Sequence, residues 1–173
     1  MNKIGNVLAM LKTRFDEEGE IMLYTLGGDR YLAKCSFNEP ATEATVGGLE
    51  EKLSVRLPDD YRQMLLLHDG LKLFYTERYG GAIEFFPIGE IQKNYLLLQD
   101  IYEGDSEEFQ GCIPVGHYPD IGWIVLDMKR YEKDKRDYVR IFGIPHIAVP
   151  GSFEDFIDRL IVTQGSAYWE WIY

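Results

Sequence analysis

The sequence predicts an α+β fold: a single domain in which a mostly antiparallel β-sheet packs against N-terminal, central and C-terminal helices. Its 173 residues are close to the length of one ordinary domain. Short β-favourable runs alternate with segments of helical periodicity, and no linker or internal repeat divides the chain. Hydrophobic residues make up 46% of the chain and aromatic residues 14%, which is enough for a core without disulfides.

The first forty residues predict a helix followed by a hairpin. Over residues 2–16, hydrophobic side chains recur with the spacing of one helical face, at Ile4, Val7, Leu8, Leu11 and Phe15. Two β-favourable runs within residues 20–37 then flank a Gly-Gly-Asp sequence. Glycine tolerates the positive φ of a tight turn, so these runs predict two paired strands.

Two short helices are predicted next, separated by a proline. The first covers residues 43–53, and an extended link leads from it to Pro58. Pro58 suits the first position of the second helix, in which the pair Asp59-Asp60 complements the positive end of the helix dipole. This helix is expected to end near His68, with Gly70 as a left-handed cap.

The rest of the chain predicts five strands and two helices. Residues 88–102 have helical periodicity, and Ser152 opens a capping-box pattern at the start of the last helix. Residues 128–136, MKRYEKDKR, predict a solvated hairpin loop. The strands are expected at residues 72–75, 82–86, 112–117, 122–127 and 137–142.

The charge of the chain limits its partners. The net charge is −11, and most of the acidic excess lies in residues 36–111. Direct binding to nucleic acid is therefore not expected, because phosphate binding needs clustered Lys and Arg. The longest apolar run near the N-terminus is far shorter than the roughly 18 residues of a membrane span, and no secretory cassette is present. We expect a cytoplasmic protein that does not contact a membrane.

No catalytic motif is apparent in the sequence. Walker-A, GxSxG and HExxH patterns are absent, and Cys35, Cys112 and the three histidines lack the spacing of metal ligands. We therefore expect no enzyme activity, cofactor or metal site. An enzyme with an unrecognised cleft, or a metal site assembled only by the fold, stays an open alternative. Glu84 and Asp127 are the carboxylates that could line a cleft, and a solvent-facing or turn position is the alternative for each.

Two segments are candidate partner-binding surfaces. The first, DIYEGDSEE, has no basic residue, and its candidate contacts are Asp100, Tyr102, Glu103, Asp105, Glu107 and Glu108. The second is the aromatic tail over residues 164–173, with Trp169 and Trp171 as candidate anchors. A solvated loop is the alternative for the first segment. For the tail, the alternative is packing against the N-terminal hairpin.

An ordered series of short motifs resembles one known family. The series begins with Leu53-Ser54-Val55 and Leu57-Pro58-Asp59-Asp60-Tyr61, and continues with an apolar helix that ends at Asp69-Gly70. Later members are Gly80-Gly81-Ala82-Ile83-Glu84-Phe85, Ile113-Pro114-Val115-Gly116, and Gly122-Trp123 leading to Asp127. This order resembles the SUKH superfamily of cell-wall-assembly regulators and toxin-immunity proteins. The resemblance covers roughly residues 41–163, and the family favours Asn in place of Asp69 and Gly in place of Ser54.

The resemblance implies a non-enzymatic protein-binding domain. Bacterial members of the superfamily commonly neutralise a cognate toxin, often a nuclease, so a basic protein toxin is the expected partner. A regulatory scaffold of the same fold that binds cellular proteins is the alternative. Residues 1–40 and the last ten residues have no counterpart in the family pattern.

Overall fold

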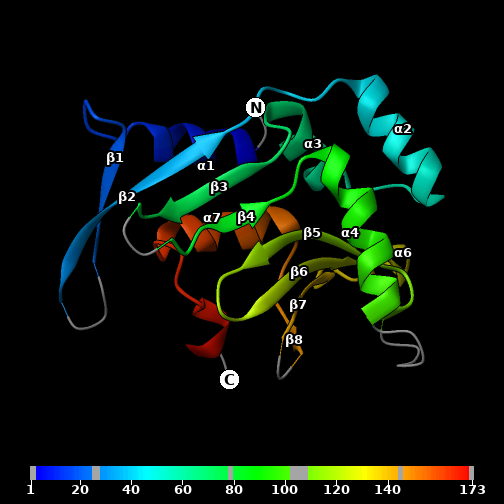
Figure 1. Ribbon diagram of the computed structural model, residues 1–173. Coiled ribbons are helices and arrows are strands. Elements are labelled where there is room, and N and C mark those ends of the chain that lie inside the picture. The colour runs from blue at the N-terminus through cyan, green and yellow to red at the C-terminus, as the bar shows by residue number, and fades with distance from the viewer. Residues whose placement is uncertain (1–2, 25–27, 78–79, 102–108, 144–145, 172–173) are drawn as a thin grey trace.

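In the part of the chain that the structure describes, eight strands form one antiparallel sheet, ordered β1 to β8 as they follow along the chain. The structure is a computed structural model, and it describes residues 3–24, 28–77, 80–101, 109–143 and 146–171 (Figure 1). The strands are β1 (Glu20–Tyr24), β2 (Arg30–Phe37), β3 (Leu71–Tyr75), β4 (Ile83–Phe85), β5 (Cys112–Tyr118), β6 (Gly122–Asp127), β7 (Val139–Phe142) and β8 (Ile147–Ala148).

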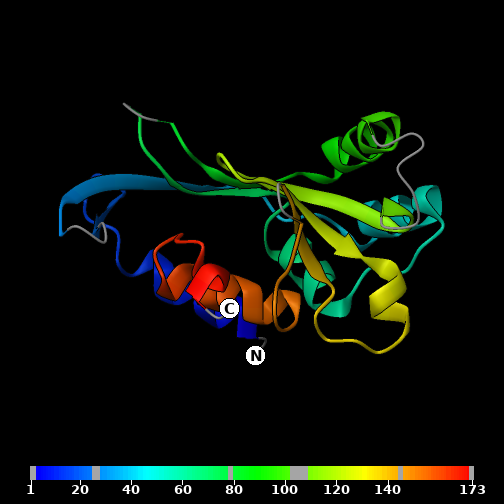
Figure 2. The same ribbon diagram turned by 90° about the horizontal axis from the view of Figure 1, so that it is seen from below.

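Helices cover the two faces of this sheet unequally. Figures 1 and 2 show α1 and α7 side by side on one face, while α4 lies on the other. The described helices are α1 (Lys3–Lys12), α2 (Glu43–Leu53), α3 (Asp59–Leu67), α4 (Ile88–Ile101), α6 (Met128–Glu132) and α7 (Phe153–Val162), with a 3-10 helix η1 (Tyr168–Trp171). The arrangement is a single α+β domain, which confirms the predicted fold class.

The main core lies between the sheet and the layer formed by α1, α3 and α7. Helix α7 contributes five buried side chains to it, and its predicted capping box is confirmed: Ser152 Oγ accepts the Asp155 N–H. The ring of Phe153 packs edge-on against Tyr61 of α3 and Phe85 of β4, with ring centroids 5.0 and 5.7 Å apart. Aromatic packing therefore joins helices from the middle and the end of the chain to the centre of the sheet.

The N-terminal segment belongs to the same unit. Helix α1 buries Ile4, Leu8 and Leu11, and the predicted hairpin is confirmed as β1 paired with β2. The helix ends at Lys12, so its predicted extension to residue 16 is wrong. The Asp16 carboxylate accepts the backbone N–H groups of Glu18 and Glu20, which fixes a turn where the helix was expected to continue.

The structure corrects two details around α3. Pro58 has an extended ψ of 138° and precedes the helix, so it is the N-cap residue rather than the first helical residue. His68 ends the helix in an extended conformation. Gly70 has the expected positive φ of 88°, but it does not cap the helix directly. A Cβ there would lie 2.7 Å from the Pro87 nitrogen, so glycine lets the start of β3 approach the end of β4.

Residues 128–136 were expected to form a solvated hairpin loop, but part of this segment is helical. The short helix α6 begins after Asp127, whose side chain accepts the Arg130 N–H at 3.1 Å, and Met128 is buried. A second element absent from the prediction is the two-residue strand β8, which pairs with β7. The other predicted strands agree with the structure to within about two residues, the scatter usual for element ends.

Candidate functional site

The aromatic tail is divided between the core and the surface. Trp169 is fully buried, and its ring contacts Tyr118 of β5 and Phe156 of α7 at centroid distances of 5.2 and 6.0 Å. The prediction that Trp169 anchors a partner is therefore wrong. Gln164, just before η1, accepts the Tyr24 N–H at 2.9 Å, so this part of the chain does reach the N-terminal hairpin. Trp171 is 58% exposed, and its role as an anchor stays a prediction.

The acidic segment is described only at its beginning. Asp100 is exposed in the last turn of α4. The remaining candidates lie outside the described residues: Tyr102, Glu103, Asp105, Glu107 and Glu108. Their contribution to partner binding stays a prediction based on the charge of the sequence.

The two cleft candidates, Glu84 and Asp127, do not share a cleft. Glu84 pairs in register with His117 near one end of β5, while Asp127 pairs with Cys112 at the other end. Five residues of strand separate these positions, which corresponds to about 17 Å. The Glu84 carboxylate lies 3.0 Å from Lys72 Nζ, and Asp127 caps α6 and faces Arg140. Asp127 also borders a separate hollow whose other charged residues are basic.

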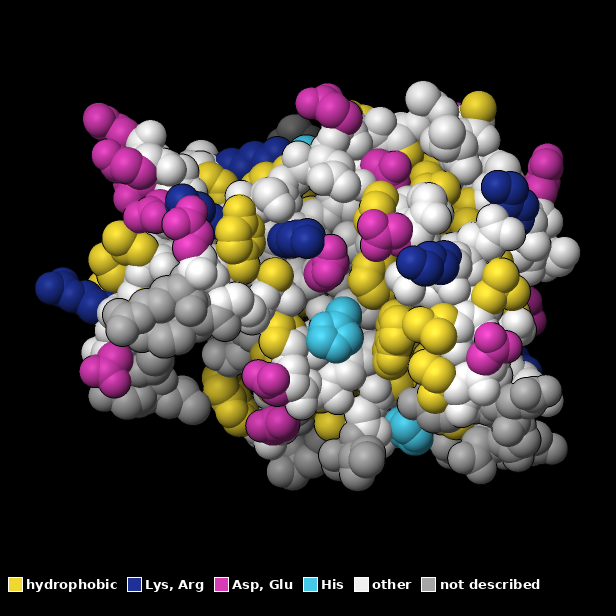
Figure 3. Space-filling view, viewed as in Figure 1, with side chains coloured by type: hydrophobic (Ala, Val, Ile, Leu, Met, Phe, Trp, Pro, Cys, Tyr) yellow, Lys and Arg dark blue, Asp and Glu magenta, His cyan; other side chains and the backbone are white. Residues whose placement is uncertain are grey.

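The sheet leaves part of one face uncovered. Helix α4 covers the region of β5, β6 and β7 through Leu98, which packs in one cluster with Cys112, Val125 and Phe142. Figure 3 shows the uncovered part as a mixed surface, with a histidine side chain near its centre and charged and hydrophobic side chains around it. We call this surface the open sheet face, and it comprises Glu20, Met22, Leu32, Lys34, Lys72, Tyr75, Glu84 and His117.

Direct pairing across strands places a polar row along this face. Lys72 of β3 pairs with Glu84 of β4, and Glu84 pairs with His117 of β5. Because directly paired residues of antiparallel strands point to the same side, these three side chains lie together. Trp123 pairs with His117 and continues the row to the edge of the region beneath α4, its ring 5.9 Å from that of Phe86. The row therefore presents both charges and an aromatic ring on a rigid backbone.

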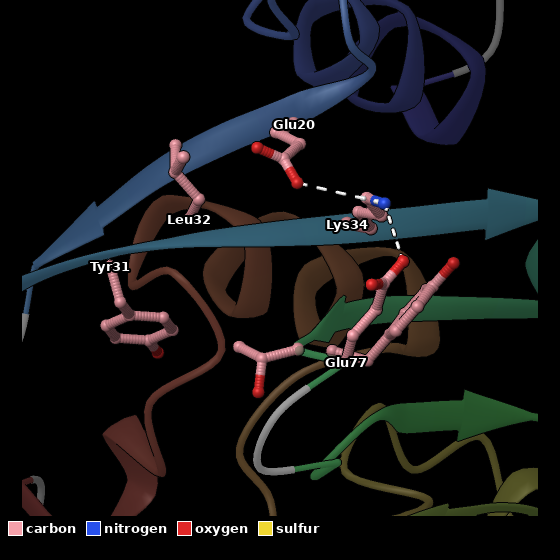
Figure 4. Close-up of a pocket in the computed structure, with 7 residues that line it drawn as sticks. Glu20, Tyr31, Leu32, Lys34 and Glu77 are labelled. Carbon is pink, nitrogen blue, oxygen red and sulfur yellow. Dashed lines mark hydrogen bonds and ion pairs between the residues drawn. The ribbon is translucent and has the colours of Figure 1, made fainter.

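A small hollow lies at the β1 side of the open sheet face. Its volume is about 250 Å³, and Figure 4 shows the Lys34 ammonium between the carboxylates of Glu20 and Glu77. Lys34 Nζ lies 2.7 Å from Glu77 Oε1 and 3.7 Å from Glu20 Oε1. The hydrogen bond with Glu77 raises the pKa of Lys34 and lowers the pKa of Glu77, so both groups are charged at neutral pH.

Hydrophobic side chains border this hollow. Leu32 lines the hollow and pairs directly with Met22 of β1, and the two side chains are 45% and 37% exposed. Tyr31 and Tyr75 also line the hollow. Exposed hydrophobic residues that occur singly need no explanation, but an adjacent pair beside aromatic rings and fixed charges is typical of an interaction surface.

A β-bulge is responsible for placing Tyr75 on this face. Lys34 pairs with Tyr75 and Ser36 with Lys72, so β3 contains one more residue than β2 between the two pairs. Phe74 adopts a positive φ of 56° within the bulge, and its N–H donates to Cys35 Sγ at 3.4 Å. The extra residue breaks the strict alternation of the strand, so Lys72 and Tyr75 point to the same side although they are three residues apart.

The chemistry that this arrangement supports is binding. Its carboxylates and ammonium groups are already engaged in ion pairs, and its rings and methyl groups offer apolar contact. Among the described residues, no three His, Cys, Asp or Glu side chains are grouped to hold a metal ion. Across the same part of the chain, none of the helices has both the length and the apolar character needed to cross a bilayer.

Among the residues of the open sheet face, only Glu84 was a candidate from the sequence. The sequence of β2, RYLAKCSF, does indicate which residues share a face. Arg30, Leu32 and Lys34 occupy every second position of the strand, so their side chains point to the same side. No local signal could reveal that Glu77 reaches Lys34 across 43 positions, or that the bulge turns Tyr75 toward them.

Comparisons with known proteins agree with the motif series and the fold. The model of the SMI1 / KNR4 family (SUKH-1) matches residues 40–159. The chain is 30% identical to YobM of Bacillus subtilis (strain 168), named an uncharacterized protein, over 99% of this chain and 94% of that protein. It is also 28% identical to YnaB of the same organism, likewise named uncharacterized, over 78% of this chain and 85% of that one. The chain belongs to the SMI1 / KNR4 family (SUKH-1).

Proposed function

We propose that this chain is a non-enzymatic immunity protein that binds and neutralises a cognate bacterial toxin, using the open sheet face as its docking surface. The family supports a protein-binding role, since immunity proteins are common among its bacterial members. The observation that carries the choice of surface is the row Lys72–Glu84–His117, which the fold aligns and leaves uncovered.

The physical character of the open sheet face suits a protein partner. Its polar groups come from paired strands, so little backbone entropy is lost when a partner docks. Tyr75 and the pair Met22 and Leu32 supply contact area, while Lys34 and Lys72 are held in place by their ion pairs. Tyrosine is among the residue types that dominate binding energy at interfaces.

The charge of the chain favours a basic partner. With a net charge of −11, the protein attracts a positively charged groove before contact, and this attraction speeds association at low salt. The acidic residues of segment 100–108 contribute to this negative charge. A nuclease toxin fits this description, because its substrate groove must attract phosphates.

The direct test uses the protein encoded by the gene beside this one. Co-expression of this chain should restore growth of cells that express that protein, and the two purified proteins should form a complex that lacks the toxic activity. A complex that keeps its activity would favour a regulatory scaffold, and no complex at all would overturn the proposal. Turnover of the toxin or of its substrate by this chain would support an enzyme.

The docking surface is tested by His117→Arg. The new cation would face Glu84 in a cross-strand pair, so the fold should tolerate it, but it places a bulky positive group at the centre of the face. We expect binding to weaken by about tenfold or more with an unchanged melting temperature. Val162→Arg is the matched control, since it adds the same charge at an exposed position of α7, on the other side of the sheet. If His117→Arg binds as tightly as the control, the open sheet face is the wrong surface.

A further inference from the structure

A basic hollow lies far from the open sheet face, at the junction of β6, α6 and β7. Its volume is about 300 Å³. Five of the 18 basic residues of this acidic chain line it. The lining residues are Gln110, Asp127, Lys129, Arg130, Lys133, Lys135 and Arg140.

The deepest cation of the hollow is fixed in place. The Arg140 side chain is 17% exposed, and its Nη1 lies 3.4 Å from Asp127 Oδ2. Its guanidinium carbon lies 5.2 Å from the centroid of the Phe142 ring, so the ring and the carboxylate orient the planar group together. One carboxylate contact uses only part of the five N–H donors of an arginine, so others remain for a ligand.

A second arginine is also held by the protein. Arg130 Nε donates to the Asp137 carbonyl oxygen at 3.0 Å, and its Nη2 pairs with the Asp137 carboxylate. The Arg130 N–H donates in turn to Asp127, the residue that contacts Arg140. The two arginines therefore contact one buried carboxylate, Arg130 through its backbone N–H and Arg140 through its guanidinium.

Two lysines at the rim of the hollow have no partner among the described residues. Lys133 and Lys135 are exposed, and neither ammonium group forms a hydrogen bond or ion pair with the described residues. Lys129 Nζ contacts the amide oxygen of Gln110 at 3.3 Å. Among the described residues that line the hollow, five are basic and one, Asp127, is acidic.

We propose that this hollow binds a short polyphosphate chain. Fixed arginines and exposed lysines are the donors that recognise phosphate oxygens, and a lining with five basic side chains and one carboxylate matches a multiply charged anion rather than a single carboxylate. A volume of about 300 Å³ is at the lower limit of small-molecule sites. None of the described residues that line the hollow is aromatic, so they offer no ring on which a nucleobase could stack, and the phosphate chain itself is the recognised group.

The site is tested by calorimetric titration of the full chain with inorganic tripolyphosphate, in buffer free of divalent metal. We expect saturable binding at one site, tighter than that of orthophosphate and weakened by salt. ATP should bind with the same affinity as tripolyphosphate, since only its phosphates would be held. Absence of tripolyphosphate binding, or tighter binding of an oligoglutamate peptide than of tripolyphosphate, would overturn the proposal.

Variants distinguish binding in this hollow from a general effect of the protein's net charge. Lys133→Glu combined with Lys135→Glu should weaken tripolyphosphate binding by about tenfold or more, because two charge-assisted contacts are lost. Lys52→Glu combined with Lys93→Glu makes the same change in net charge at exposed positions of α2 and α4, and should bind as wild type. Equal losses in both variants would show that only overall charge matters. The toxin-binding test above changes none of these four lysines, so each proposal can fail independently.

Discussion

Tyr138 donates its hydroxyl hydrogen to Asp60, and the hydroxyl oxygen lies 2.6 and 2.5 Å from the two carboxylate oxygens. The two residues are 78 positions apart in the chain. The same hydroxyl accepts the Phe153 N–H at 3.1 Å, and Asp60 accepts the Glu154 N–H at 3.0 Å. One tyrosine and one carboxylate thereby join the start of α3 to the first turn of α7. Burial and the neighbouring carboxylate both raise the pKa of Tyr138, so it stays protonated and able to donate.

Tyr138→Phe should destabilise the protein by about 1–3 kcal/mol, because the buried Phe153 N–H would lose its acceptor. Denaturant unfolding of the variant and the wild type measures this difference. Tyr131→Phe is a suitable control, since its ring packs 5.1 Å from that of Tyr138 and its hydroxyl takes no part in this network. A free energy of unfolding equal to that of the wild type would mean that the network does not stabilise the fold.

Gly165→Ala should destabilise the protein by about 2–4 kcal/mol. Gly165 has a φ of +81°, and a Cβ there would lie 2.8 Å from the Phe74 ring. Gly48→Ala is the matched control: it lies inside α2 with no heavy atom near its would-be Cβ, so it should stabilise the helix by about 0.5–1 kcal/mol. Thermal melts of the two variants should shift in opposite directions. A melting temperature of Gly165→Ala equal to or above that of the wild type would contradict the geometry at Gly165.

The two tryptophans of the tail should behave differently when truncated. Trp169→Ala removes a fully buried ring and should cost about 3–5 kcal/mol of stability. Trp171→Ala removes an exposed ring and should change stability by no more than about 0.5 kcal/mol. Urea unfolding curves monitored by circular dichroism compare the two. Equal effects on stability would mean that η1 does not pack as described.

Acid should weaken the junction between α1 and α7. The hydrogen bond from Lys3 Nζ at 2.7 Å, with contacts to Ser152, lowers the pKa of Asp155 to about 2. The folded state therefore favours the carboxylate, and its contribution is complete above the unfolded pKa of about 3.9. That contribution is lost as the pH falls from about 4 to about 2. The difference in melting temperature between the wild type and Asp155→Asn should shrink over this range, and a constant difference would contradict the assignment.

Local patterns in the sequence predicted most of the secondary structure. The bounds of α2, the hairpin and the capping box of α7 depend on residues close together in the chain, such as Ser152 and Asp155. Other features depend on contacts that no local pattern contains. Trp169 is buried because Tyr118 and Phe156 lie where its ring packs. Helix α6 is a different case, because its N-cap contact is local: Asp127 accepts a backbone N–H three residues ahead, and the prediction of a loop overlooked it.

The candidate site was less predictable than the fold. Glu84 could be identified as a polar residue in an apolar strand, but its partner Lys72 depends on strand order. Tyr75 reaches the same face only through the bulge at Phe74, whose positive φ is unusual for a bulky residue. The sequence therefore identified single candidate residues. The surface that joins them depends on the register in which the strands pair.

Hydroxyl-radical footprinting can show whether the toxin docks on the open sheet face. The protein is oxidised alone and in complex with the protein encoded by the neighbouring gene. Two methionines serve as internal probes. Met22 is 37% exposed on the open sheet face, and Met10 is 69% exposed on α1, in the layer on the opposite side of the sheet. Complex formation should protect Met22 from oxidation and leave Met10 as reactive as before. Protection of Met10 with unchanged oxidation of Met22 would contradict it.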